Sequence, residues 1–194
     1  MPERDEWTAL LQLAREVIRT GTDRGVRMVV DPATFPDALR RRQASFVTLT
    51  SGGMLRGCCG ATVAIDTLVE DLARHAWRTA FDDPRFPPMS HAELAGQVLE
   101  ISLLSPLRTV EARSREALIS NLVPGVTGLL ISHGDRRATF LPKVWESLPD
   151  PDQFIDHLRV KAGLSVEDWP RGLQAQVYTT ESFCGSLDEA ESLP

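Results

Sequence analysis

The sequence lacks any apolar run of the ~18–20 residues that a helix needs to cross a bilayer, so no membrane-spanning segment is expected. It also lacks a basic excess. Acidic residues number 27 against 21 basic ones, and a net charge of −6 disfavours a dedicated nucleic-acid-binding protein. The first residues, Met1–Glu6, are polar and show no signal-peptide pattern of charged residues followed by an apolar stretch. We therefore expect neither a membrane nor a nucleic acid as a partner.

Cysteine is scarce, with three residues in the chain. Cys58 and Cys59 are adjacent, and adjacent cysteines rarely bridge because the ring they would close is strained. Cys184 lies far away in the sequence. This usage excludes a disulfide framework and indicates a reducing, cytoplasmic environment.

Local signatures of metal and cofactor binding are missing as well. The four histidines are widely spaced, and no pair shows the spacing of metal ligands. There is no phosphate-binding loop, no dinucleotide glycine pattern and no nucleophile elbow. We therefore expect no cofactor and no locally encoded metal site, although a site assembled in three dimensions stays open. His75 and His157 fall on predicted helices and are expected at the surface.

What is present is an ordinary globular composition, 42% hydrophobic and 25% charged, in a length that suits one large domain or two small ones. Helical spacing of apolar residues predicts a helix over about 5–20, ended by Gly21. A second helix is predicted over 67–80, capped by Asp66. The other predicted elements are strands at 45–50, 54–63, 98–105, 128–132, 137–141 and 175–180, short helices starting near 91 and 114, a helix beginning at Pro142, and a helix at 151–162.

The order of these elements suggests an internal repeat. A hairpin followed by two helices occurs at about 45–96 and again at about 128–163. An extra strand follows each time. The long internal loops at 22–44 and 106–125 could form a small lobe.

The stretch Met54–Gly60, with sequence Met-Leu-Arg-Gly-Cys-Cys-Gly, is the most informative segment. Strand alternation would place Arg56 and Cys58 on one face, and Leu55, Gly57 and Cys59 on the other. A cation beside a thiol stabilises the reactive thiolate. A packed structural cysteine is the alternative interpretation of Cys58.

Residues 55–60 resemble the Leu-Arg-Gly-Cys-Ile-Gly signature of the AMMECR-type domain family. Further blocks match in order, and they lie at 80–88, 99–105, 124–129, 137–145 and 161–164. The resemblance spans about 8–182 and is closest to the bacterial branch called AmmeMemoRadiSam system protein A. Two departures stand out: Cys59 replaces an isoleucine, and Thr127 stands where relatives tend to carry His or Asp.

The resemblance implies an α+β fold with a single curved, barrel-like sheet, outer helices and two similar β/α repeats. The domain would cover 5–182, and 183–194 would form a partly disordered tail. A Memo-like protein and a radical SAM protein are the implied partners.

The candidate site combines the signature with two polar blocks. Cys58 is the proposed reactive thiol, Arg56 would stabilise its thiolate, and Glu100 would act as a general base or metal ligand, with an exposed or ion-paired strand face as the alternative for Glu100. Arg85, with Asp83, Gly57 and Ser102, would bind the substrate, since a guanidinium can hold an anion in a bidentate manner. An ion pair of Arg85 with Asp83 or Glu100 is the structural alternative.

Two functional hypotheses follow. In the first, the protein is an enzyme or enzyme subunit that acts on a small anionic metabolite together with its two partners. In the second, it is a non-catalytic interaction or scaffolding module for the Memo-like protein.

Overall fold

The structure is a computed structural model that describes residues 4–188, and the chain divides into two compact units. The first unit contains residues 4–103 and 181–188 of the described chain, and the second contains residues 104–180. The helices and strands, in chain order, are α1 (Arg4–Arg24), β1 (Ser45–Ser51), β2 (Met54–Gly60), α2 (Leu68–Phe81), β3 (Gln97–Leu104), β4 (Arg108–Val110), α3 (Arg115–Ile119), β5 (Gly128–His133), β6 (Arg136–Phe140), α4 (Pro151–Lys161), β7 (Gln174–Tyr178) and β8 (Thr180–Ser186). Short 3-10 helices lie at Pro32–Thr34, Asp37–Arg40, His91–Glu93 and Pro142–Glu146.

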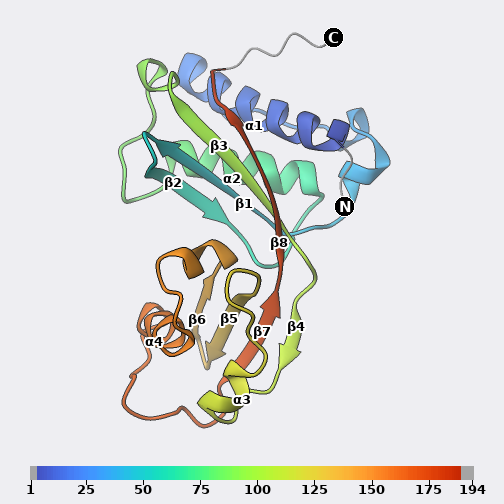
Figure 1. The fold of residues 1–194 in the computed structure, drawn as a ribbon. Helices are drawn as coiled ribbons and strands as arrows, with labels where there is room; N and C mark the ends of the chain where they lie inside the picture. The colour runs from blue at the N-terminus through green and yellow to red at the C-terminus, as the bar shows by residue number, and fades with distance from the viewer. Residues whose placement is uncertain (1–3, 189–194) are drawn as a thin grey trace. The chain divides into compact units, whose positions relative to one another are not determined.

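The first unit is built on a four-stranded sheet in the order β2-β1-β3-β8. Helices α1 and α2 pack together on one side of this sheet (Figure 1). Alternate residues of β1 and β3, such as Val47 and Ile101, are fully buried against these helices. On β8, Phe183 stacks on Trp7 of α1 with ring centroids 5.5 Å apart. The opposite side of the sheet is covered by neither helix, and we call it the open face.

Helix α1 runs beyond its predicted end. Gly21 lies inside the helix, which continues to Arg24 and is followed by Gly25 in the left-handed region, with φ of +66°. A Cβ on Gly21 would lie 2.3 Å from the ring of Phe81. Gly21 is therefore needed for close packing between α1 and α2, which a sequence pattern cannot distinguish from a helix end.

The start of α2 also differs from the prediction by one residue. Thr67, and not Asp66, is the N-cap, and it forms a capping box with Glu70. Asp66 instead forms an ion pair with Arg74, with 2.8 Å between Oδ2 and Nη1. The helix itself covers 68–81, close to the predicted 67–80.

The second unit has its own four-stranded sheet, in the order β4-β7-β5-β6, and its own core. Phe154 and Ile155 of α4 are fully buried in this core. Trp145 stacks on Phe154 with ring centroids 3.7 Å apart, and its indole donates a hydrogen bond of 2.7 Å to the carbonyl of Thr127. The predicted helix from Pro142 is a 3-10 helix.

The prediction of a single barrel-like sheet is wrong, because the described strands form two separate, open four-stranded sheets. Pro106 follows β3 and cannot donate to a ladder, so the chain leaves the first sheet there. The repeat is nevertheless present. In each sheet a hairpin pairs with a third strand, β3 or β7, and the third strand pairs with a fourth, β8 or β4. Each fourth strand follows, in the chain, the third strand of the other sheet. Strands β4 and β8, the two fourth strands, were not predicted as separate elements.

The internal loops do not form a lobe of their own. Leu39, from the 22–44 loop, is fully buried in the core of the first unit, and Leu118 is fully buried in the core of the second. In the expected tail, β8 extends to Ser186 and Leu187 is fully buried. The rest of that tail, residues 189–194, lies outside the described residues.

Candidate functional site

Strand β2 lies at the edge of its sheet, and Asp83 accepts a hydrogen bond from one backbone N–H of this strand. The backbone N–H of Cys58 donates a hydrogen bond of 3.0 Å to Oδ2 of Asp83. An edge strand otherwise exposes such groups to any partner that can pair with them. The loop after α2 is therefore tied directly to the signature strand.

Asp83 also holds Arg85 in a bidentate pair. The Nε and Nη2 atoms of Arg85 lie 2.9 and 2.6 Å from the two carboxylate oxygens, and its backbone N–H adds a third hydrogen bond. The side-chain hydrogen bonds from Arg85 hold the pKa of Asp83 far below its usual range. Asp83 is thus ionised at neutral pH and positions Arg85, whose side chain is 53% exposed.

Cys58 shares the open face with two polar residues. The register pairs Thr48 of β1 with Cys58 on one side and with Glu100 on the other, so the three side chains form one row across the strands. The Thr48 hydroxyl donates a hydrogen bond to the sulfur of Cys58, with 3.4 Å between the two atoms. Cys58 is half-buried and carries a free thiol. The row therefore joins a thiol, a hydroxyl and a carboxylate.

Strand β8 extends the open face beyond β3. The Ser102 and Ser182 hydroxyls lie 2.8 Å apart, and the backbone N–H of Leu187 donates to the carbonyl of Gln97. These two contacts define an antiparallel register. In that register Cys184 lies opposite Glu100 and ends the row that begins at Cys58.

Glu100 and Ser102 are brought together as the alternation predicted. The Ser102 hydroxyl donates to a carboxylate oxygen of Glu100 over 3.5 Å, while Ser102 itself is 4% exposed. The hydroxyl of Ser182 thus connects through Ser102 to the Glu100 carboxylate.

Gly57 and Cys59 face the helices instead. A Cβ on Gly57 would lie 2.3 Å from the backbone oxygen of Thr79 in α2, so α2 occupies the space beside Gly57. Burial raises the pKa of the Cys59 thiol above its ordinary value, although Arg78 opposes this rise. Cys59 accordingly behaves as a packing residue, as its replacement of an isoleucine suggested.

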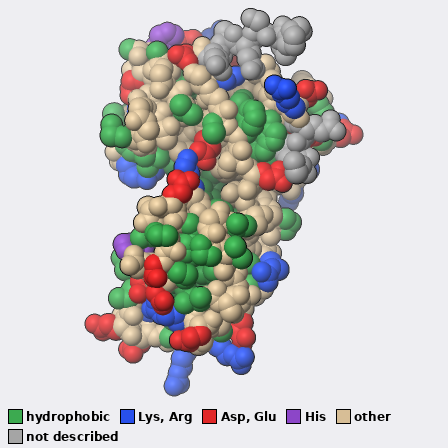
Figure 2. Space-filling view, viewed as in Figure 1, with side chains coloured by type: hydrophobic (Ala, Val, Ile, Leu, Met, Phe, Trp, Pro, Cys, Tyr) green, Lys and Arg blue, Asp and Glu red, His purple; other side chains and the backbone are tan. Residues whose placement is uncertain are grey.

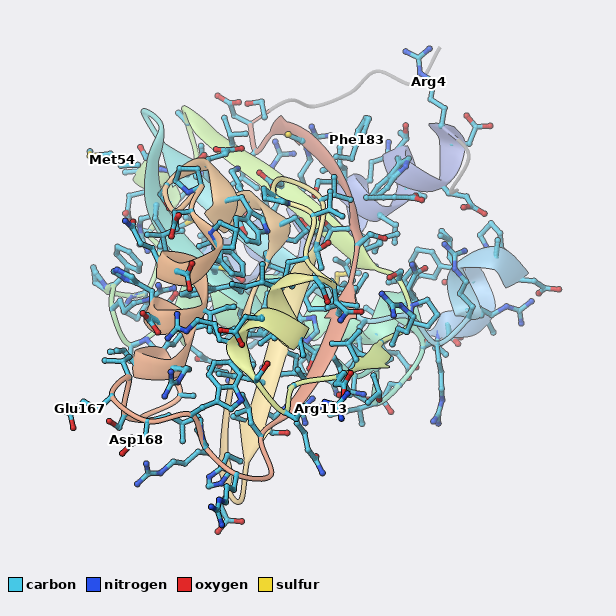
Figure 3. All side chains as sticks on the ribbon, turned by 60° about the horizontal axis from the view of Figure 1, so that its bottom comes forward. Arg4, Met54, Arg113, Glu167, Asp168 and Phe183 are labelled. Carbon is cyan, nitrogen blue, oxygen red and sulfur yellow. The ribbon has the colours of Figure 1, made fainter. Side chains whose placement is uncertain are left out.

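A bulge in β2 changes the predicted position of Leu55. The register shifts by one residue between Leu49 and Thr50, so that Leu55 pairs with Thr50. Leu55 is therefore on the side of Thr50 and Thr48, the open face, and the strict alternation assigned it to the wrong side. Met54, 73% exposed, projects from the tip of this hairpin (Figure 3).

Arg56 is buried and has partners in the loop after α2. Its Nε donates to Glu93 over 3.0 Å, and its Nη2 donates to the carbonyl of Pro87 over 2.9 Å. Its guanidinium also lies 5.6 Å from the ring centroid of Phe86. Arg56 therefore fastens the 82–93 loop to β2, and its effect on the Cys58 thiolate stays a prediction.

Thr127, which stands where relatives tend to carry His or Asp, has a structural role in the second unit. Its hydroxyl accepts a hydrogen bond of 3.0 Å from the backbone N–H of Val123, and the residue is 7% exposed. Its carbonyl accepts from Trp145, as described above. It closes a turn before β5.

Of the two histidines that were predicted to lie at the surface, one is buried. His157 is exposed as expected, but His75 is buried, with 3% of its surface exposed, because its side of α2 packs onto the sheet. Within residues 4–188, no group of three or more His, Cys, Asp or Glu side chains is arranged to hold a metal ion. Over the same residues, no helix combines the length and the apolar character needed to cross a membrane.

Sequence reasoning missed Thr48, Ser182 and Cys184 as members of the open face. For Thr48 a signal was present, since it alternates with the buried Val47 and Leu49 in a predicted strand. For Ser182 and Cys184 there was none, because β8 pairs with a strand about eighty residues away.

Comparisons with known proteins give a consistent result. A family model described as AMMECR1 matches residues 11–183. A protein of Methanothermobacter thermautotrophicus is 36% identical over 166 residues, covering 83% of this chain and 84% of the relative. A protein of Thermofilum pendens is 31% identical over 206 aligned positions, covering 95% and 94%. The crystal structure of an uncharacterised protein from Pyrococcus horikoshii is similar with a TM-score of 0.83 and 31% identity, covering 91% of this chain and 89% of that one.

Proposed function

This chain belongs to the AMMECR1 family, and on that premise we propose that it is an enzyme or enzyme subunit acting on a small anionic metabolite through the thiol of Cys58. The observation that carries the proposal is the anchoring of Cys58 and Arg85 by one carboxylate, that of Asp83. It holds an exposed guanidinium beside the strand that carries the thiol. The backbone N–H of Cys58 and Nη2 of Arg85 bind the same oxygen, Oδ2 of Asp83.

The remaining residues of the open face have defined roles in this proposal. Thr48 holds the sulfur of Cys58 by its hydrogen bond, and Glu100 serves as the base in the same row. Arg85 binds the anionic group of the metabolite, since a guanidinium fixed on one edge retains donors on the other. Ser182 offers its exposed hydroxyl group for neutral parts of the ligand, and the buried Ser102 positions that hydroxyl.

We also place the chain in the bacterial AmmeMemoRadiSam system protein A branch, in the cytoplasm, with a Memo-like protein and a radical SAM protein as partners. The signature Leu55–Gly60 supports this assignment, and the free cysteines of the described chain suit a reducing compartment. The reaction would depend on both partners.

Alkylation kinetics test the thiol. With iodoacetamide at neutral pH, in a Cys184→Ser background, Cys58 is expected to react faster than Cys59, whose burial raises its pKa. Replacing Arg85 by Gln should slow Cys58 at least about threefold, since a cation near the thiolate is lost. Peptide mass spectrometry over time gives both rates.

The matched control is Arg113→Gln, which removes an exposed arginine in the other unit. It should leave both rates unchanged. Equal rates for Cys58 before and after the Arg85 substitution would contradict the proposed charge assistance. Unchanged product formation by Cys58→Ser, with both partners present, would rule out the nucleophile.

A second function is favoured by a different observation, the apolar side chains on the same open face. Leu55 and Val98 are each 43% exposed, and both pair with Thr50, so they lie in one row. Figure 2 shows hydrophobic side chains reaching the surface of the molecule among charged ones of both signs. A protein partner would cover such a row, and the domain would then be a docking module for the Memo-like protein.

Co-purification distinguishes the two functions. If the open face is a docking surface, Leu55→Glu and Val98→Glu should each abolish capture of the Memo-like protein, because a charge would be buried at the interface. Cys58→Ser should leave capture unchanged. Capture that survives both glutamate substitutions would exclude this face as the docking surface.

A further inference from the structure

A hollow lies on the side of the first unit that carries the helices. It has a volume of about 220 Å³ and lies between α1, the loop after it and α2. Its apolar lining comes from Val17, Met28, Val30 and Trp77. This volume is smaller than that of pockets for drug-sized ligands. It would hold about seven water molecules, so the cavity suits a small metabolite.

The aromatic wall of this cavity is held rigidly. Trp77 packs on Phe81 with ring centroids 4.5 Å apart, and the absence of a side chain at Gly21 makes room for both rings. The guanidinium carbon of Arg27 lies 5.5 Å from the Trp77 ring centroid. Arg27 and Phe81 thus cover part of the Trp77 ring, and a flat ligand contacts the preformed remainder that lines the cavity.

Two guanidinium groups line the cavity, and the carboxylates that pair with them do not. Arg27 pairs with Asp82 at 3.0 Å, and Arg74 pairs with Asp66 at 2.8 Å and also with the buried Asp71. Each arginine is thus oriented from outside the cavity. The Arg27 pair is largely exposed, and exposed pairs contribute little, so a ligand carboxylate can replace or share it at low cost.

The acidic residue in the lining, Glu70, forms its hydrogen bonds with the start of α2. Glu70 accepts hydrogen bonds at Oε2 from both the backbone N–H and the hydroxyl of Thr67, and so completes the capping box of α2. Its negative charge is directed at the helix N-terminus, where the helix dipole favours it. Among the charged groups of the lining, the two arginines are therefore the ones that can donate hydrogen bonds to an anionic ligand.

We propose that this cavity is a binding site for a small aromatic carboxylate, with the ring against Trp77 and the carboxylate on Arg27 and Arg74. Planar recognition of a carboxylate by guanidinium groups next to an aromatic surface is the chemistry that these residues share. The cavity is lined by the stripe Glu70, Ala73, Arg74 and Trp77 of α2, while Thr79 of the same helix faces the sheet. The site is independent of Cys58 and of the function proposed for it.

The test compares benzoate with benzyl alcohol and benzylamine, which share the ring and differ in charge. Titration of the full chain, followed by calorimetry and by ligand-observed NMR, should show benzoate binding about tenfold more tightly than the alcohol, and benzylamine binding most weakly. Arg27→Gln should remove most of this preference and leave the affinity for benzyl alcohol unchanged. Arg27 is exposed, so this variant is expected to fold.

Two further variants complete the design. Arg113→Gln, which belongs to the second unit and is not among the lining residues of the cavity, should bind benzoate as the unmodified chain does. Ala73→Leu should block all three probes by filling the cavity. Equal affinities for benzoate and benzyl alcohol, benzoate binding that resists both Arg27→Gln and Arg74→Gln, or no detectable binding of benzoate would each overturn the proposal.

Discussion

Acidification from neutral pH to about pH 4 is expected to cost the first unit about 3 kcal/mol of folding free energy through His75 alone. The imidazole is buried under α2, and its Nδ1 lies 3.1 Å from the hydroxyl of Ser45. Burial lowers the pKa of His75 to about 4, and the neighbouring Arg74 and Arg78 act in the same direction. The folded protein therefore keeps this histidine neutral.

The direction of the effect follows from proton binding. An unfolded chain protonates His75 near pH 6.5, whereas the folded chain does so only near pH 4. Between these values the unfolded state binds more protons, so stability falls as the pH falls, and the loss is complete below about pH 4. Above about pH 6.5 His75 contributes no pH dependence.

Urea unfolding at a series of pH values between these limits measures this loss. In His75→Gln, whose amide can still bond to Ser45 but does not titrate, the free energy of unfolding should fall much less steeply. Other groups with lowered pKa, Asp83 among them, titrate in both proteins and cancel in the comparison. His157→Gln, at an exposed position, should follow the unmodified protein. Parallel curves for the protein and His75→Gln would show that His75 is not the cause.

Substitution of Gly57 by alanine is expected to destabilise the first unit by about 3 kcal/mol or more, although it adds a single methyl group. The new Cβ would lie 2.3 Å from the backbone oxygen of Thr79. A backbone atom cannot rotate away as a side chain can, so α2 would have to move from β2. Chemical denaturation of the variant gives the change in free energy.

Two controls separate this clash from a general effect of replacing glycine. Gly53→Ala, in the β1–β2 turn with φ of +80° and nothing within 4 Å, should cost about 1–2 kcal/mol from backbone strain alone. Thr79→Ser removes the methyl group that lies 3.2 Å away and leaves the backbone oxygen, so it should not rescue Gly57→Ala. A cost for Gly57→Ala no larger than that for Gly53→Ala, or full rescue by Thr79→Ser, would contradict the packing argument.

The signature strand therefore contains glycines that close packing requires and a cysteine that faces away from the helices. Gly57 admits α2, and a Cβ on Gly60 would lie 2.3 Å from the ring of Phe46, so both glycines serve packing. Cys58 is the residue between them that faces away from the helices. The alternation of the strand predicted this separation of Cys58 from Cys59 correctly, because the period of two depends only on the strand backbone.

The amino-acid sequence by itself determined the family, the two hairpins, the positions of α1, α2 and α4, the separation of Cys58 from Cys59, and the shared face of Glu100 and Ser102. These features depend on local spacing, on turn glycines and on the short-range geometry of helices and strands. Only the tertiary structure decided that the strands form two sheets, that Asp83 rather than solvent meets the edge of β2, that His75 is buried, and that Cys184 ends the row begun by Cys58. Each of these depends on contacts between segments distant along the chain, which no local pattern encodes.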